Sequence, residues 1–242
     1  MLSDKEKLEY DMLVIIREAC QAIGCGAICV QLQEQGHSIS EATVGRLLRD
    51  LDRARYTAKT GFQGRTLSAA GVERLAHLAS KQRGMQWGVE FAAALQGHTK
   101  EQLLEVLVAR RAIESELAAL AAVNATAAEV EKLDSIMEEQ RQIIAAGGAA
   151  AQLDVDFHAL IAQMARNRIL MAAVALIRQD DQLSPVLEHI RRQVNSAAYI
   201  DHRKIYQGIA GSSPVTARQA MTEHIDKLID DVEKYWEQSS HA

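Results

Sequence analysis

The segment Asp154-Val155-Asp156-Phe157-His158 decides how the second half of this chain folds and what it can bind. A carboxylate and an imidazole four residues apart lie about one turn from each other on one face of a helix, so both can reach a single point. His202 and His224 follow, each in an apolar helical context where an imidazole has few polar partners. Three imidazoles and one carboxylate suit zinc, nickel or a similar first-row ion.

Each of these side chains also has an ordinary structural interpretation. A single histidine on an apolar helix face is more often a hydrogen-bonded core residue than a ligand. Asp154 and His158 can equally form a helix-surface pair, worth about a few tenths of a kcal/mol. The residues alone therefore leave a metal site and a purely structural role open.

The spacing of these residues resembles a known family. The pattern D-x-x-F-H, an asparagine nine residues later at Asn167, then H-x-x-I-x-x-x-I from His202 and A-x-x-x-M-x-x-H ending at His224, is similar to the FCD ligand-sensing domain of GntR-type regulators of the FadR subfamily. Ala109-Arg110-Arg111-Ala112-Ile113-Glu114 resembles the first helix of that domain. The resemblance covers about Glu101 to Trp236. It implies that Arg110 and Asn167 face a bound effector and that four side chains hold a divalent cation: Asp154, His158, His202 and His224.

Arg110 falls on the apolar stripe of its predicted helix, where a charge needs a partner. One interpretation is an ion pair with Glu114, four residues later. The other, which the resemblance implies, is that the planar guanidinium of Arg110 binds the carboxylate of a ligand. Four protein ligands leave positions open on an octahedral ion, and a small carboxylate or hydroxy acid would fill them.

The first third of the chain predicts a winged helix-turn-helix. One helix ends at Ile23-Gly24, a second stops at Gly36, and a third runs over Ser40–Arg53. Tyr56–Thr60 and Arg65–Leu67, joined by a glycine-flanked turn, predict a hairpin before a helix from Ser68 to about Ala79. This segment resembles the winged helix of ribonuclease R and of a methanogen nitrogen-regulation repressor. It lacks the V-R-x-A-L recognition pattern of the usual GntR head.

In such a fold the third helix enters the major groove and the hairpin contacts the DNA backbone. Residues 1–84 hold 12 Lys/Arg against 10 Asp/Glu, whereas the whole chain has a net charge of −5. The polar and basic side chains of the third helix and the hairpin are therefore candidate DNA contacts, with an ordinary solvated surface as the alternative: Ser40, Thr43, Arg46, Arg49, Arg53, Lys59 and Arg65.

The predicted fold class is mainly α. We expect a winged helix-turn-helix over 1–84, a linker over 85–99 and an all-α antiparallel FCD-like bundle over 100–238. The N-terminus has no apolar core of the signal-peptide type and no window is long enough to span a membrane, so we expect a cytoplasmic protein with no membrane partner. Three cysteines in one predicted helical region do not predict a disulfide framework: Cys20, Cys25 and Cys29.

These features predict a DNA-binding transcriptional regulator and not an enzyme. It would bind a double-stranded operator as a homodimer, and a small organic acid at the metal centre would change its affinity for DNA. Two other classes remain open. One is a metal-dependent hydrolase or lyase acting on a small carboxylic acid, with Asp156 or Glu223 as general base. The other is a helical protein-interaction module.

Overall fold

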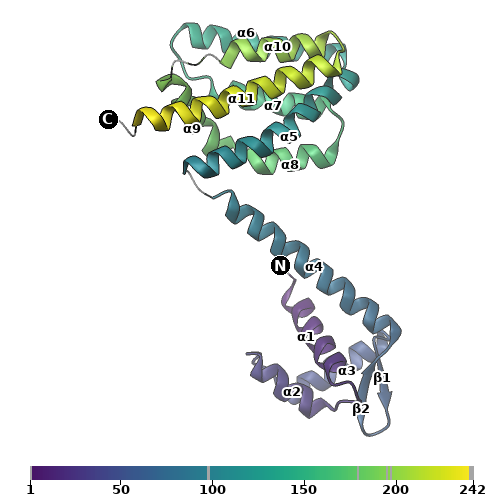
Figure 1. The fold of residues 1–242 in the computed structure, drawn as a ribbon. Helices are drawn as coiled ribbons and strands as arrows, with labels where there is room; N and C mark the ends of the chain where they lie inside the picture. Colours follow the sequence, from purple (N-terminus) through teal and green to yellow (C-terminus); the bar gives the residue numbers. More distant parts are fainter. Residues whose placement is uncertain (1, 97–98, 179, 195, 197, 240–242) are drawn as a thin grey trace. The chain divides into compact units, whose positions relative to one another are not determined.

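A computed structural model describes residues 2–96, 99–178, 180–194, 196 and 198–239 (Figure 1). The described chain consists of helices and one two-stranded sheet, and it divides into two compact units, Met1–Ala93 and Ala94–Ala242. The predicted fold class, a winged helix followed by a helical bundle, is confirmed. No described helix is both long and apolar enough to cross a membrane.

The first unit is a winged helix-turn-helix. Its elements are α1 (Asp4–Glu18), α2 (Cys25–Glu34), α3 (Glu41–Arg53), β1 (Thr57–Thr60), β2 (Gly64–Leu67) and α4 (Ala69–Ala94). The strands pair antiparallel with Thr57 opposite Leu67. Gly64 has φ +126°, and a Cβ there would come within 2.1 Å of the Ile23 carbonyl oxygen, so only glycine lets this strand start against the α1–α2 connection.

The fourth helix is longer than predicted. The expected end at about Ala79 is wrong, since α4 continues to Ala94 through much of the predicted linker. Gly84 and Gly88 each cost about 1 kcal/mol relative to alanine in a helix, but they do not break it, and no proline interrupts the segment. Residues 97 and 98 of the predicted linker lie outside the described residues.

The second unit is a helical bundle. Its elements are α5 (Lys100–Asn124), α6 (Ala127–Ala145), α7 (Ala151–Met164), α8 (Arg168–Arg178), α9 (Asp180–Gln193), α10 (Ala198–Ala210) and α11 (Pro214–Ser239). Thr99 and Thr126 each form a capping box, which fixes the starts of α5 and α6. Helix α11 packs along α5 and α10, and α7 packs between α5 and α6 (Figure 1).

Residues 185–210 belong to two helices, α9 and α10. Pro185 lies inside α9 rather than at its first position. Residues 195 and 197 lie outside the described chain. Leu187, Glu188 and Arg191 of α9 line a cavity in the bundle.

Candidate metal and effector site

The four predicted metal ligands meet inside the helical bundle. Asp154 and His158 come from α7, His202 from α10 and His224 from α11, and one ligand atom from each lies within 4.8 Å of the others. The three imidazoles are buried, and the Asp154 side chain is 17% exposed.

Close packing of α10 on α11 makes this convergence possible. Gly208 of α10 lies against Ala217 of α11, where a Cβ at position 208 would come within 2.6 Å of the Ala217 nitrogen. The Phe157 ring stacks on His202 with ring centroids 4.2 Å apart. The backbone approach and the stacked ring together restrict where the His202 imidazole can lie.

The proton on His202 is located by its neighbour. His202 Nδ1 lies 2.9 Å from Gln140 Oε1, and since an amide oxygen can only accept, Nδ1 carries the proton. The other nitrogen, Nε2, then has a lone pair, and it lies 3.4 Å from Asp154 Oδ1, which is also an acceptor. Two acceptors facing each other in a buried site are favourable with a cation between them.

His158 is arranged in the same way. Its Nδ1 lies 2.5 Å from Glu114 Oε2, at ion-pair distance although the angles fall outside those of a hydrogen bond. Since a carboxylate only accepts, this contact places the proton on Nδ1 and leaves the Nε2 lone pair 3.9 Å from Asp154 Oδ1. A carboxylate behind a histidine is the usual way that a metal-binding imidazole is oriented.

The inner atoms of the cluster have no hydrogen-bond partner among the described residues: Asp154 Oδ1, His158 Nε2, His202 Nε2 and both ring nitrogens of His224. Buried polar atoms without partners are costly and rare. Nitrogen and carboxylate donors converging on one point form the ligand set of a first-row divalent ion, so the residues present fit such an ion.

Burial keeps the histidines unprotonated. It lowers the pKa of His158 to about 4, against the attraction of Glu114, and it also lowers the pKa values of His202 and His224. Burial alone would raise the pKa of Asp154, but His202, His158 and Arg178 hold it well below its ordinary value. At neutral pH the cluster is therefore three neutral imidazoles and one carboxylate, the protonation state in which they bind metals.

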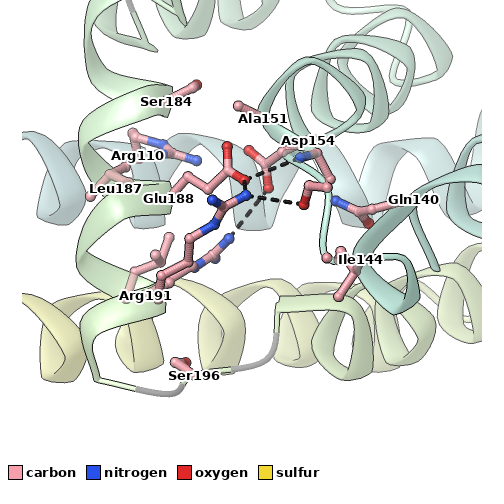
Figure 2. Close-up of a pocket in the computed structure, with 15 residues that line it drawn as sticks. Arg110, Gln140, Ile144, Ala151, Asp154, Ser184, Leu187, Glu188, Arg191 and Ser196 are labelled. Carbon is pink, nitrogen blue, oxygen red and sulfur yellow. Dashed lines mark hydrogen bonds and ion pairs between the residues drawn. The ribbon is translucent and has the colours of Figure 1, made fainter. Parts of the chain in front are cut away.

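A cavity of about 360 Å³ opens beside Asp154 (Figure 2). The side chains of Arg191 and Glu188 extend from α9 toward Asp154 and Gln140 in that view. The cavity is lined by both the metal-ligand candidate Asp154 and the basic residues Arg110, Arg191 and Arg192. A site of this size, mainly apolar with a few convergent charges, suits a small anionic ligand.

The two interpretations of Arg110 both have support. Its Nε donates to Glu114 Oε1 at 2.6 Å in a buried pair, as the structural interpretation predicted. Its Nη2 is buried without a hydrogen-bond partner among the described residues, and the residue lines the cavity. Glu114 therefore holds Arg110 through Nε, and the contact between Arg110 and an effector stays a prediction.

Asn167 does not line this cavity. Its Oδ1 accepts the backbone N–H groups of Ile169 and Leu170 at 3.1 Å each, so it caps the start of α8. Capping is a common role for asparagine just before a helix, and the effector contact at Asn167 stays a prediction.

The predicted DNA contacts fall into two groups. Arg46, Arg49 and Lys59 are exposed, on α3 and β1. Ser40 caps α3 through Thr43, and Arg53 pairs with Asp50 on the surface. Arg65 donates from Nε and Nη2 to the Asp52 carboxylate at 2.9–3.0 Å, and its side chain is 14% exposed. It therefore ties β2 to α3. Phe62, at the hairpin tip and fully exposed, was not among the predicted contacts.

The general bases considered for a hydrolase or lyase lie away from the cluster. Asp156 is exposed and accepts from Gln152, while Glu223 is exposed and pairs with Lys204. Neither lines the cavity. His189, the histidine of α9, is also exposed, with its ring near Tyr235.

Sequence reasoning missed three residues at the site: Gln140, Arg178 and Arg191. Arg178 Nη2 lies 3.2 Å from Asp154 Oδ2, and Arg191 Nη1 lies 3.5 Å from Asp154 Oδ1. The available signal was a polar or basic residue within an otherwise apolar helix face, the same signal that drew attention to Arg110.

Comparisons with known proteins agree with this architecture. The FCD domain family matches residues 105–227, and the ribonuclease R winged-helix domain matches residues 10–75. The HTH-type transcriptional regulator LutR of Bacillus subtilis is 24% identical over 145 residues, which cover 58% of this chain and 66% of LutR. The global nitrogen regulator NrpRI of Methanosarcina mazei is 36% identical over 70 residues, which cover 29% of this chain and 22% of NrpRI.

Among solved structures, E. coli McbR/YncC shares the fold with a TM-score of 0.50 and 16% identity, over 98% of this chain and all of that one. A winged helix followed by this helical bundle is the architecture shared with these relatives, which are named as transcriptional regulators. The chain belongs to the FCD domain family, the FadR type of these regulators, and its relatives are regulators rather than hydrolases or lyases.

Proposed function

We propose that this regulator binds a divalent transition metal, zinc or nickel, through Asp154, His158, His202 and His224. A small organic acid would bind in the adjacent cavity and change how a homodimer binds its double-stranded DNA operator. The metal would supply open coordination positions for the acid, while the protein residues orient and neutralise it.

One observation carries the metal proposal. The acceptors Glu114 and Gln140 favour the tautomers of His158 and His202 that carry the proton on the outer nitrogen, so the inner lone pairs face Asp154 Oδ1 across a buried space. A structural cluster would instead point N–H groups at the carboxylate. The arrangement therefore favours a cation over a self-contained hydrogen-bond network.

The effector proposal rests on the cavity next to Asp154. Arg110, whose Nη2 has no hydrogen-bond partner among the described residues, lines this cavity, and Arg191 and Arg192 add positive charge. A guanidinium in a largely enclosed site is well suited to a carboxylate because it offers two parallel N–H donors. A small carboxylic acid thus fits both the charge and the volume.

For DNA binding we propose Arg46, Arg49 and Lys59 as direct contacts, since they are exposed on the third helix and the hairpin. Ser40, Thr43 and Arg53 lie at the two ends of α3, where phosphate contact is compatible with their local bonds. Arg65 would act mainly by holding the hairpin on α3. Two half-sites one helical turn apart would require the homodimer.

Metal analysis tests the central claim. Full-length protein is stripped with a chelator, incubated with zinc or nickel, desalted and analysed by elemental mass spectrometry. We expect one ion per wild-type chain, and loss of the ion in Asp154→Asn and His202→Ala. Asp154→Asn keeps the shape of the side chain. Circular dichroism checks that both variants are folded.

His189→Ala is the matched control because this histidine is exposed on α9 and lies outside the cluster. It should bind as much metal as wild type. If wild type holds no more ion than the Asp154 and His202 variants, the metal proposal is wrong.

A further inference from the structure

The two oxygens of Asp154 have different partners. Arg178 Nη2 lies 3.2 Å from Oδ2. Oδ1 faces the imidazoles, 3.4 Å from His202 Nε2 and 3.9 Å from His158 Nε2, and it is also 3.5 Å from Arg191 Nη1. The oxygen best placed to bind an ion is thus the one that a guanidinium already contacts.

An ion and Arg191 compete for this oxygen. Both are cations, and in a buried site two positive charges on one carboxylate oxygen repel each other strongly. The Arg191 side chain is 13% exposed, so water screens little of that repulsion. An ion on Asp154 Oδ1 therefore weakens the contact between that oxygen and Arg191.

Arg191 can turn into the cavity. It lines the cavity together with Asp154 and Arg110. The charged groups around Arg191 are Asp154 from α7, Arg110 from α5, Asp201 from α10 and Asp231 from α11. Asp201 already pairs with Lys227, and Asp231 is buried with one oxygen that has no hydrogen-bond partner among the described residues. The charges of Asp201 and Asp231 attract a guanidinium that has left Asp154.

We propose, on the basis of the function proposed above, that Arg191 is a switch that couples metal binding to effector binding. Without metal, Arg191 occupies Asp154 Oδ1 and opposes the ion. With metal bound, Arg191 is released and its guanidinium binds the carboxylate of the effector in the cavity.

Charge balance around the site supports this coupling. Arg110, Arg178 and Arg191 each contact Glu114 or Asp154. A divalent ion adds two positive charges to this group, and the carboxylate of an anion in the cavity offsets one of them. Coupling between two binding sites is reciprocal. The anion must then increase the affinity for the ion by the same factor as the ion increases the affinity for the anion.

The test is Arg191→Met, which keeps an unbranched apolar stem and removes the charge. Nickel affinity is measured on metal-free, full-length protein by competition with a chromophoric chelator, with and without excess acetate as the probe anion. Without acetate, Arg191→Met should bind nickel about 10-fold more tightly than wild type, because the competitor for Oδ1 is gone. A purely structural role predicts the opposite sign.

Acetate gives the second readout. It should tighten nickel binding about 5-fold or more in wild type and have little effect in Arg191→Met. Arg218→Met is the matched control, since Arg218 lies in the same helical unit, pairs with Glu116 near the surface and does not line the cavity. It should keep the wild-type nickel affinity without acetate.

The outcomes separate the two proposals. If wild type binds nickel but Arg191→Met binds it equally or more weakly, the switch is wrong while the metal site stands. If acetate changes the nickel affinity of wild type and Arg191→Met equally, or does not change that of wild type, Arg191 does not bind the anion. If wild type binds no nickel or zinc, the proposed function fails and the switch fails with it.

Discussion

Gln140 of α6 fixes the imidazole of His202 of α10, whose Nδ1–H donates to the amide oxygen at 2.9 Å. Both residues are buried, and Gln140 also lines the cavity. The direction of the inner nitrogen of His202 therefore depends on a residue that is not itself a ligand. Partners of this kind keep a metal-binding imidazole in one tautomer and one orientation.

Gln140→Leu should weaken metal binding about 10- to 100-fold, the usual effect of removing such a partner. Leucine has a similar volume but accepts no hydrogen bond, so His202 loses its fixed tautomer. The affinity is measured by chelator competition on stripped protein. Gln142→Leu, on the exposed face of α6, is the control and should bind as wild type does. Equal affinities for both variants would mean that Gln140 does not position the ligand.

Glu114→Gln should destabilise the helical unit by about 3–5 kcal/mol in the absence of metal. The Glu114 carboxylate contacts Arg110, His158 and Arg178, all of them buried, and the amide would leave these cationic or polar groups without their charge partner. Urea unfolding followed by circular dichroism measures the change.

Glu116→Gln is the control for that substitution. Glu116 is two residues away on α5 and pairs with Arg218 near the surface, with both side chains almost half exposed. Its loss should cost at most about 1 kcal/mol. If the two variants unfold at the same urea concentration, the buried ion pairs of Glu114 do not stabilise the helical unit more than the surface pair of Glu116 does.

Much of the fold could be predicted because its signals are local. Ser40, Thr99 and Thr126 fix helix starts through their own side chains, and the glycines of the hairpin fix its turn. The end of α4 could not be predicted from the same signals. Gly84 and Gly88 weaken a helix without ending it, and the outcome depends on the whole segment.

The site was predicted in part. The spacing of Asp154 and His158 on α7 is a property of one helix, so the sequence shows it directly. Arg191 contacts Asp154 across the bundle, and no sequence period connects them. Asn167 and Arg65 carry the residue types expected of contacts, but local partners engage them first: a helix start for Asn167, and Asp52 for Arg65.

Acid should destabilise the metal-free protein well above the pH at which most carboxylates titrate. Burial lowers the pKa of His158 to about 4, whereas the unfolded chain takes up a proton near the ordinary histidine value of 6.5. The unfolded state therefore binds more protons between these values, and the free energy of unfolding falls as the pH drops through this window. His158 alone contributes about 3 kcal/mol.

His202 and His224 shift in the same direction and add to that loss. Urea unfolding in the presence of a chelator, at several pH values between about 7 and 5, measures the slope. His158→Gln should reduce it, because glutamine takes up no proton. A free energy of unfolding that stays constant over this range would contradict the buried, neutral state of the histidines.

In the winged-helix unit, Arg46→Ala and Arg65→Ala should change different properties: DNA affinity for Arg46→Ala and folding stability for Arg65→Ala. Arg46 is exposed on α3, so its removal should weaken DNA binding, leave folding intact and, if it contacts a phosphate, reduce the salt dependence by about one charge. Arg65 is bonded to Asp52, so its removal should lower the stability of the unit by about 1–2 kcal/mol.

Fluorescence anisotropy over a series of salt concentrations measures DNA binding, with a duplex that the wild-type protein has selected from a random pool. Thermal unfolding measures stability. The assignment of Arg65 to the hairpin rather than to DNA fails if Arg65→Ala keeps wild-type stability and loses affinity as Arg46→Ala does.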